Sequence, residues 1–196
     1  MDRRAVLGDA AAVQAVFDEA IALHSRVRDG VLAPIVETSR AITLAFAAGG
    51  KLLAFGNGGS ATDAQHLATE LVGRFERERA GLAALALTSD GSVLTSLAND
   101  GTFDRVFARQ IEALGRPGDV AIGISTSGNS PNVLAGIEAA NARGLTTVAL
   151  TGRDGGAAGK LAAIHIHVPG GSTARVQEVH RTVIHAICTL VEREIG

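Results

Sequence analysis

Short, uninterrupted apolar runs alternating with helical stretches constrain the fold of this chain more than any other feature. The runs lie at residues 51–55, 85–87, 120–124, 147–150 and 164–168. Helical spacing fills the intervals, most clearly at residues 60–75, 103–114, 133–142 and 176–194. Continuously apolar strands are typical of a parallel sheet that helices cover on both faces. The sequence therefore predicts an α/β protein with a doubly wound, five-stranded parallel sheet.

The last apolar run differs from the others. His165 and His167 alternate there with Ile164, Ile166 and Val168. Alternation in a strand sends the polar side chains to one face of the sheet. We therefore expect this run to be an edge strand with one wet face.

The first fifty residues have helical rather than strand periodicity. We predict two helices, a first that ends at Gly30 and a second over 32–48 with Pro34 in its first turn. The resulting helical hairpin, residues 1–50, would belong to the same unit as the domain at 51–196. It has more apolar surface than one domain edge needs, so we expect it to mediate self-association, with extra core as the alternative.

Composition and charge exclude several classes of function. The 196 residues have a formal net charge of −2, whereas general nucleic-acid and membrane-surface binders need a basic field. A single cysteine, Cys188, cannot form an internal disulfide. The opening residues contain no apolar run long enough for a signal peptide or a membrane span. We therefore expect a cytoplasmic protein without nucleic-acid or membrane partners.

Glycine, serine and threonine cluster after three of the predicted strands, at residues 56–60, 125–130 and 151–156. In open parallel sheets ligands bind beyond these strand ends, where backbone N–H groups and helix N-termini favour anions. No nucleotide P-loop motif is present, and neither lysine, Lys51 or Lys160, lies in these loops. The glycines could merely allow tight turns, but hydroxyl-rich loops after separate strands favour phosphate binding through neutral donors.

Two further groups of side chains have the chemistry of a metal or acid–base site. His66 and Glu70 are four residues apart, so they share one helix face and can ligate one metal ion or simply contact each other. Gln177 and His185 are separated by roughly 80° around their helix, so both can border one cleft. His180 has a different bearing, which suggests a structural or interfacial role. Spacing alone does not show that the two helices meet.

Taken together, these motifs resemble the phosphoheptose isomerase family of sugar isomerase (SIS) domains, which have a flavodoxin-like arrangement. The similarity runs through nearly the whole chain, including the N-terminal helical segment. The motifs that resemble the family are Gly56-Asn57-Gly58-Gly59-Ser60, Asp63-Ala64-Gln65-His66 with Glu70, Ala98-Asn99-Asp100, the stretch Gly123 to Ser130, Leu150-Thr151-Gly152 and Val176-Gln177-Glu178.

The resemblance implies roles for individual residues. It implies a homotetramer whose active sites are shared between subunits, each with one zinc ion. The implied zinc-site residues are His66, Glu70, Gln177 and His185, of which Glu70 and Gln177 would also contact substrate. The implied phosphate cradle consists of Ser125, Thr126, Ser127 and Ser130. Further implied substrate contacts are Asn57, Gly58, Gly59, Asn99 and Asp100, the last of which could instead be a loop cap.

The implied reaction converts sedoheptulose 7-phosphate to D-glycero-D-manno-heptose 7-phosphate, for surface polysaccharide biosynthesis. Such a reaction moves a proton between C1 and C2 through an enediolate, so we assign Glu70 as the base and His185 as its partner. Glu70 cannot be a tight metal ligand and a free base at once, so it either shifts during turnover or acts beside the metal. The alternatives are a non-catalytic SIS protein that binds a replication initiator, and an isomerase or sensor for another phosphosugar. The presence of both Glu70 and His185 favours the enzyme.

Overall fold

The predicted strands form one all-parallel, five-stranded sheet in the computed structural model, which describes residues 3–195. The strands are β1 (Leu52–Gly56), β2 (Ala84–Ala86), β3 (Val120–Ser125), β4 (Thr146–Thr151) and β5 (Ile164–His167). The helices are α1 (Arg3–Ala47), α2 (Gly59–Val72), α3 (Gly91–Asp100), α4 (Val106–Leu114), α5 (Pro131–Ala142), α6 (Gly156–Leu161) and α7 (Thr173–Ile195), with a 3-10 turn at Phe103–Arg105. The doubly wound parallel sheet predicted from the apolar runs is confirmed.

The order of the strands in the sheet determines which strand ends lie side by side. The order is β2-β1-β3-β4-β5, so β1 and β3 are neighbours, with Phe55 paired to Gly123 and Gly56 to Ile124. The chain leaves β1 toward β2 on one side and returns to β3 on the other. The carboxyl ends of β1 and β3 therefore form the topological switch point, where open α/β sheets bind their ligands.

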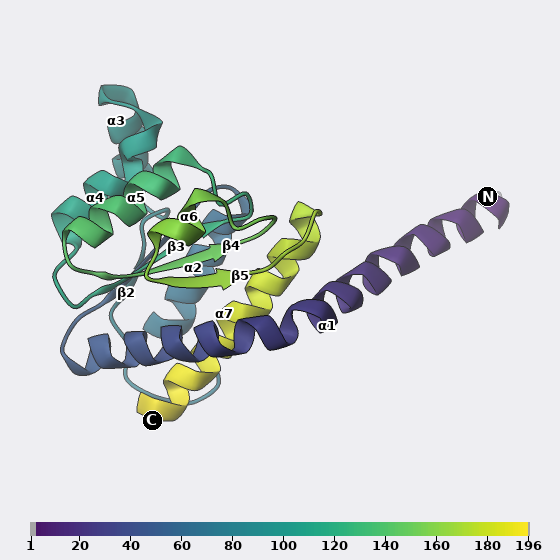
Figure 1. Ribbon diagram of the computed structural model, residues 1–196, viewed down its shortest axis with the longest axis horizontal. Helices are drawn as coiled ribbons and strands as arrows, with labels where there is room; N and C mark the ends of the chain where they lie inside the picture. Colours follow the sequence, from purple (N-terminus) through teal and green to yellow (C-terminus); the bar gives the residue numbers. More distant parts are fainter. Residues whose placement is uncertain (1–2, 196) are drawn as a thin grey trace.

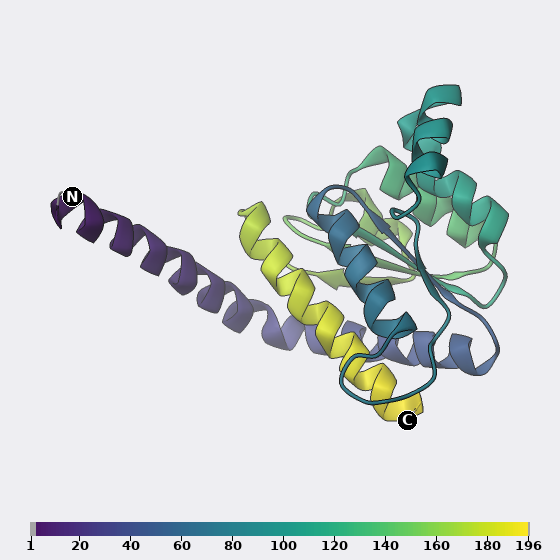
Figure 2. The ribbon, with the colours of Figure 1, turned by 180° about the vertical axis from the view of Figure 1, so that it is seen from behind.

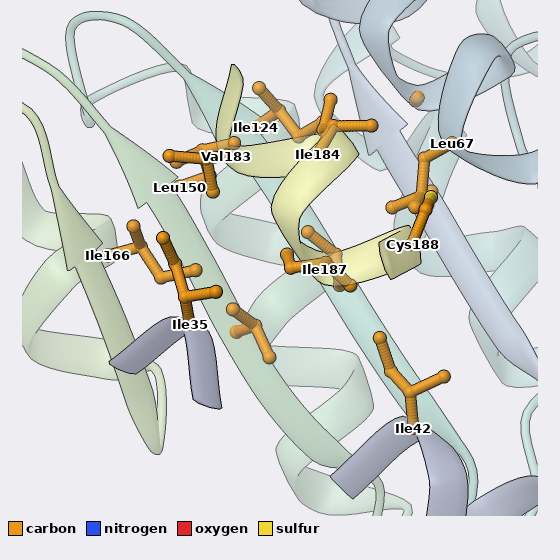
Figure 3. Packing of buried hydrophobic residues seen from close by; sticks show 14 of the residues in the cluster. Ile35, Ile42, Leu67, Ile124, Leu150, Ile166, Val183, Ile184, Ile187 and Cys188 are labelled. Atoms are coloured by element: carbon orange, nitrogen blue, oxygen red, sulfur yellow. The ribbon is translucent and has the colours of Figure 1, made fainter. Parts of the chain in front are cut away.

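Both faces of the three central strands, β1, β3 and β4, are buried, which explains why these strands are apolar throughout. Helices α1, α2 and α7 cover one face, and α3 to α6 cover the other (Figures 1 and 2). Figure 3 shows Val183 and Ile184 of α7 beside Leu150 and Ile124 of the central strands, in the cluster that also contains Ile42 of α1. Leu53, one residue along β1 from Leu52, faces the opposite core.

The N-terminal segment is one continuous helix, α1, so the predicted hairpin is wrong. Gly30 stays within the helix instead of ending it, and Pro34 lies in the helix interior. A proline there removes the hydrogen bond to the carbonyl four residues earlier, which is that of Gly30. The helix continues because Val27, Val31 and Ile35 remain on one buried stripe of the core. Tertiary packing thus outweighs the two local helix-breaking signals.

The first half of α1 extends away from the rest of the domain (Figures 1 and 2). It exposes a stripe of large apolar side chains, which we call the α1 stripe and which consists of Val13, Val16, Phe17 and Ile21. By length and composition alone, Gly8–Ala47 could cross a membrane, which the opening residues did not lead us to expect. Only 33% of its most apolar window is buried. The second half of α1 lies instead on the sheet, where it contributes to the core.

The edge position of β5 is confirmed, because it pairs only with β4 within the described residues. Ile164 and Ile166 are buried, whereas His165 and His167 are partly exposed. The His165 ring is hydrogen-bonded to the Thr151 hydroxyl at 2.7 Å. Burial, followed by the charge of His167, lowers the pKa of His165. The wet face is thus only half exposed.

A buried ion pair closes the end of the sheet opposite the switch point. The Asp119 carboxylate accepts hydrogen bonds from the Lys51 ammonium at 2.6 Å and from the backbone N–H groups of Lys51 and Arg116, each at 2.9 Å. Burial alone would raise the pKa of Asp119, but these hydrogen bonds outweigh it and the pKa is lowered. This pair ties the start of β1 to the start of β3.

Candidate active site

Two polar loops meet at the switch point, one after β1 and one after β3. They are joined by a pair of side-chain amides, because Asn57 and Asn132 each donate to the other at 2.8 and 2.9 Å. Asn132 is buried in the first turn of α5. The pair fixes the amide of Asn57, a predicted substrate contact, relative to the loop after β3. No pattern in the sequence marks Asn132 as its partner.

The hydroxyls predicted to form a phosphate cradle cluster in the loop after β3. The Ser125 hydroxyl is buried and lies 3.3 Å from that of Ser127 and 3.1 Å from that of Ser130. Thr126 is half-buried between the first two. Ser130 occupies the N-cap position of α5, yet its hydroxyl makes no capping hydrogen bond. The hydroxyls therefore gather at the N-terminus of a helix, where an anion is favoured.

The shape of this loop depends on close packing against the loop after β4. Gly128 has a φ of +65°, and a Cβ at this position would overlap the carbonyl oxygen of Gly155. The Gly128 carbonyl accepts a hydrogen bond from Ala158 N–H at 2.9 Å, and the Asn129 side chain accepts one from Ala157 N–H at 2.9 Å. The glycines after β3 and β4 thus let two backbones come into contact.

Helices α2 and α7 pack together and bring His66 and Glu70 to His185, whereas Gln177 contacts α2 two turns away. Contacts recur every four residues along α7, starting with the Gln177 amide, which lies where a Cβ of Gly59 would be. Arg181 then pairs with the buried Asp63 at 2.7 Å, and His185 meets His66. Burial raises the pKa of Asp63, although Arg181 opposes this shift. The family resemblance placed His66 and His185 in one site, whereas nothing in the sequence pointed to the ion pair between Arg181 and Asp63.

His66, Glu70 and His185 converge although His66 and His185 are 119 residues apart in the chain. The two Nε2 atoms are 2.9 Å apart, and Glu70 Oε1 is 3.4 Å from the Nε2 of His66. Burial, and then the charge of Arg181, lowers the pKa of His66, which favours its neutral form. The Phe75 ring packs against the His185 imidazole, and the two ring centroids are 5.5 Å apart. The site therefore combines a carboxylate with two imidazoles.

The donor set is suited to zinc. Neutral imidazole nitrogens and a carboxylate oxygen are zinc ligands, and two nitrogens bound to one tetrahedral zinc ion are roughly 3.3 Å apart. The nitrogens of His66 and His185 would need to separate only slightly to reach that spacing. Among the side chains of residues 8–195, no three His, Cys, Asp or Glu groups are already arranged as metal ligands. The fit rests on the chemistry and proximity of the donors.

Two predicted substrate contacts lie apart from these groups. Asn99 donates to the Asp100 carboxylate at 2.9 Å, and both side chains are exposed. They occupy the C-terminal end of α3, which projects from the domain in Figure 1. Gly58, in contrast, immediately precedes α2 at the switch point. A single chain thus assembles the cradle and the carboxylate–imidazole group but not the contacts at 99 and 100.

His180 has the structural position expected from its bearing on α7. It is fully buried, and its Nε2 donates to the Thr151 carbonyl at 3.1 Å. Burial lowers the pKa of His180 to about 4, so the ring is neutral at physiological pH. It anchors α7 to the end of β4 and stays outside the carboxylate–imidazole group.

Comparison with known proteins identifies relatives of this chain. A family profile described as "SIS domain" matches residues 15–152. Phosphoheptose isomerase from Thiobacillus denitrificans is 52% identical over 185 residues, which cover 93% of this chain and 90% of that protein. The one from Aquifex aeolicus is 53% identical over 161 residues, covering 82% of this chain and 84% of that protein.

Solved structures agree with the sequence relatives. Phosphoheptose isomerase GmhA from Neisseria gonorrhoeae has a TM-score of 0.89 at 43% identity, covering 94% of this chain and 98% of that one. A phosphoheptose isomerase from Francisella tularensis has a TM-score of 0.91 at 32% identity with the same coverage. The chain therefore belongs to the SIS-domain family and, within it, to the phosphoheptose isomerases, so it is a sugar-phosphate isomerase of heptose biosynthesis.

Proposed function

We propose that this isomerase converts sedoheptulose 7-phosphate to D-glycero-D-manno-heptose 7-phosphate in the cytoplasm. The observation that supports this most is the convergence of Glu70, His66 and His185 on α2 and α7, because α2 begins at the switch point beside the loop that holds the serine cluster. A carboxylate and an imidazole side by side supply the base and the proton carrier that an aldose–ketose isomerase needs. The serine cluster supplies neutral donors for the phosphate at the far end of the substrate.

The proton movements balance with these two side chains. Glu70 removes a proton from C1 of the ketose, which gives a cis-enediolate, and returns a proton to C2. His185 carries the proton from O1 to O2, so that the carbonyl moves from C2 to C1. Donors fixed around the substrate before reaction stabilise the developing oxyanion. Together the steps convert a ketose to an aldose without any oxidant or reductant.

We propose that His66, Glu70, Gln177 and His185 hold one zinc ion in each active site. When bound, the ion supplies a Lewis acid that polarises the substrate carbonyl. Gln177 contacts Gly59 at the start of α2, the helix that carries His66 and Glu70, which supports its inclusion in this set. The neutral state of His66 keeps a nitrogen lone pair free for a ligand role.

The serine cluster predicts a binding defect rather than a chemical one. We expect Ser127→Ala to raise KM for the phosphosugar by about 10-fold with kcat changed less than twofold, because one donor to a charged oxygen is lost. Initial rates over a range of substrate concentrations measure both constants. Ser96→Ala, an exposed serine of α3, is the matched control. An unchanged KM in Ser127→Ala would remove this hydroxyl from the cradle.

We further propose that the chain is a homotetramer with active sites shared between subunits. The α1 stripe supports this, because Phe17 is 65% exposed and Ile21 is 63% exposed in the half of α1 that extends from the domain. A neighbouring subunit could also bring an active site to the exposed Asn99 and Asp100, the implied substrate contacts that lie apart from the site in a single chain.

A charge placed on the α1 stripe tests the assembly. We expect Phe17→Glu to lower the mass measured by analytical ultracentrifugation from that of a tetramer to that of a smaller species, because burying an unpaired carboxylate is unfavourable. Asp18→Arg changes an exposed residue roughly 100° around the helix and should leave the mass unchanged. A Phe17→Glu variant with the wild-type mass would show that the stripe is not an interface.

Isotope labelling tests the reaction itself. Incubation with sedoheptulose 7-phosphate in deuterated water should yield the aldose with deuterium at C2, and a chelator should abolish its formation. A purely binding SIS protein would retain the phosphosugar without turnover. Absence of any aldose, even with added zinc, would overturn the proposed function. Faster conversion of a different ketose phosphate in the same assay would reassign the substrate.

A further inference from the structure

A buried carboxylate on α7 organises the segment that follows α2. Glu192 has a side chain only 3% exposed, and its two oxygens accept three backbone N–H groups. Oε1 accepts from Phe75 at 2.9 Å, while Oε2 accepts from Glu76 at 3.0 Å and Arg77 at 3.1 Å. Glu192 thereby fixes the backbone conformation of residues 75–77.

The same carboxylate holds a buried guanidinium. Arg79 Nε lies 3.1 Å from Glu192 Oε1, and the Arg79 side chain is 6% exposed. The guanidinium also donates to backbone carbonyls at the end of α2, at 2.7 Å to Glu70 and 2.8 Å to Leu71. These carbonyls belong to the last turn of the helix, which has no intrahelical N–H partner for them. We call Arg79 and Glu192 the clasp.

The clasp contacts one proposed proton-transfer residue, Glu70, directly and is linked to the other, His185, through Phe75. Arg79 donates directly to the backbone carbonyl of Glu70. Glu192 lies seven residues after His185, two turns along the same face of α7, and holds the backbone N–H of Phe75. The ring of Phe75 in turn packs against the His185 imidazole. The Arg79–Glu192 ion pair therefore links the backbone of Glu70 to the imidazole ring of His185, by way of Phe75.

We propose that Arg79 and Glu192 are positioning residues that keep Glu70 and His185 in register for proton transfer, an inference that rests on the proposed function. The reasoning is geometric, because a shift of about 1 Å in a catalytic group costs on the order of 100-fold in rate. Neither clasp residue hydrogen-bonds to the serine cluster among the described residues. Loss of the clasp should therefore lower kcat and leave KM nearly unchanged.

Two variants break the clasp in different ways. In the wild-type protein each Glu192 carboxylate oxygen accepts from two donors. Glu192→Gln replaces one of these oxygens with an NH₂ group, which cannot accept the hydrogen bonds. Arg79→Lys keeps a positive charge beside Glu192, but one ammonium cannot replace the fork that also reaches Glu70 and Leu71. We expect each variant to reduce kcat at least 10-fold with KM within twofold, measured well below its melting temperature.

Asp119→Asn is the matched control for stability. Asp119 is also a buried carboxylate that accepts backbone N–H groups and pairs with a cation, but its partners are Lys51 and Arg116, and it contacts neither Glu70 nor Phe75. The Asp119→Asn substitution should lower the melting temperature without lowering kcat more than twofold. Variants at Arg79 and Glu192 that retain kcat within twofold, or lose no more than Asp119→Asn, would overturn the positioning role.

A second readout needs no turnover. In ¹⁵N-histidine spectra of the metal-free protein, with the His185 signals assigned by His185→Gln, the ring signals of His185 should shift in Glu192→Gln and stay in place in Asp119→Asn. Unshifted signals in Glu192→Gln would contradict the proposal. If the wild-type protein formed no aldose, the proposed function would fail, and these spectra would still decide whether the clasp positions His185.

Discussion

Glu70→Gln is expected to lower kcat by about 10²- to 10⁴-fold while phosphosugar binding stays within about twofold of wild type. The amide has nearly the same shape as the carboxylate but cannot accept a proton from carbon. The substrate phosphate would still meet the serine cluster, whose hydroxyls lie in a different loop. Loss of turnover without loss of binding is the signature of a group that acts only in the transition state.

Two measurements separate these quantities. Aldose formation followed by NMR gives kcat, and calorimetric titration with the phosphosugar gives the dissociation constant. Glu138→Gln, which alters an exposed carboxylate on α5, should behave as wild type. Wild-type turnover in Glu70→Gln would remove this residue from the mechanism. A dissociation constant raised as much as kcat is lowered would instead assign it to substrate binding.

Gly128→Ala should have the second-largest effect, on both stability and binding. A side chain at a φ of +65° is strained, and its Cβ would collide with the Gly155 carbonyl oxygen. Relief requires the loops after β3 and β4 to separate, which also displaces Ser127 and Ser130. We expect the free energy of unfolding to fall by about 1–3 kcal/mol. KM should rise at least 10-fold, because the hydroxyls no longer point to one phosphate position.

Gly118→Ala isolates the collision from the backbone strain. Gly118 also has a positive φ, +89°, but a Cβ there meets nothing within 4 Å, and the residue lies at the opposite end of the sheet. It should lose stability through strain alone and keep its KM. Chemical denaturation and initial-rate measurements on both variants supply the comparison. Equal KM values for the two would mean that the cradle does not depend on this contact.

Periodicity and strand character predicted the sheet because they are local properties of the sequence. The run at 120–124 needs only its own apolar residues to be recognised as a buried strand, and β3 occupies it. Gly30 and Pro34 misled the same reasoning at α1, since both weaken a helix locally. The core contacts of Val27, Val31 and Ile35, which hold α1 together, come from distant parts of the chain.

In the candidate site, too, contacts within one helix could be predicted from the sequence, whereas contacts between helices could not. Spacing along one helix predicted that His66 and Glu70 share a face, and Nε2 and Oε1 lie 3.4 Å apart. The meeting of His66 with His185 depends on how α2 packs against α7, and only the family resemblance pointed to it. Nothing local connects Arg79 with Glu192, because their pairing requires the turn after α2 to fold back on α7.

The phosphate cradle has a consequence for how the protein responds to its surroundings. Its loop offers hydroxyls and backbone amides, and residues 125–130 contain neither lysine nor arginine. Attraction between fixed charges weakens as ionic strength rises, whereas hydrogen bonds from neutral groups depend on it far less. A phosphosugar held in this way would keep nearly the same affinity from dilute buffer to concentrated salt. The enzyme's substrate saturation would then follow metabolite supply rather than the ionic conditions of the cell.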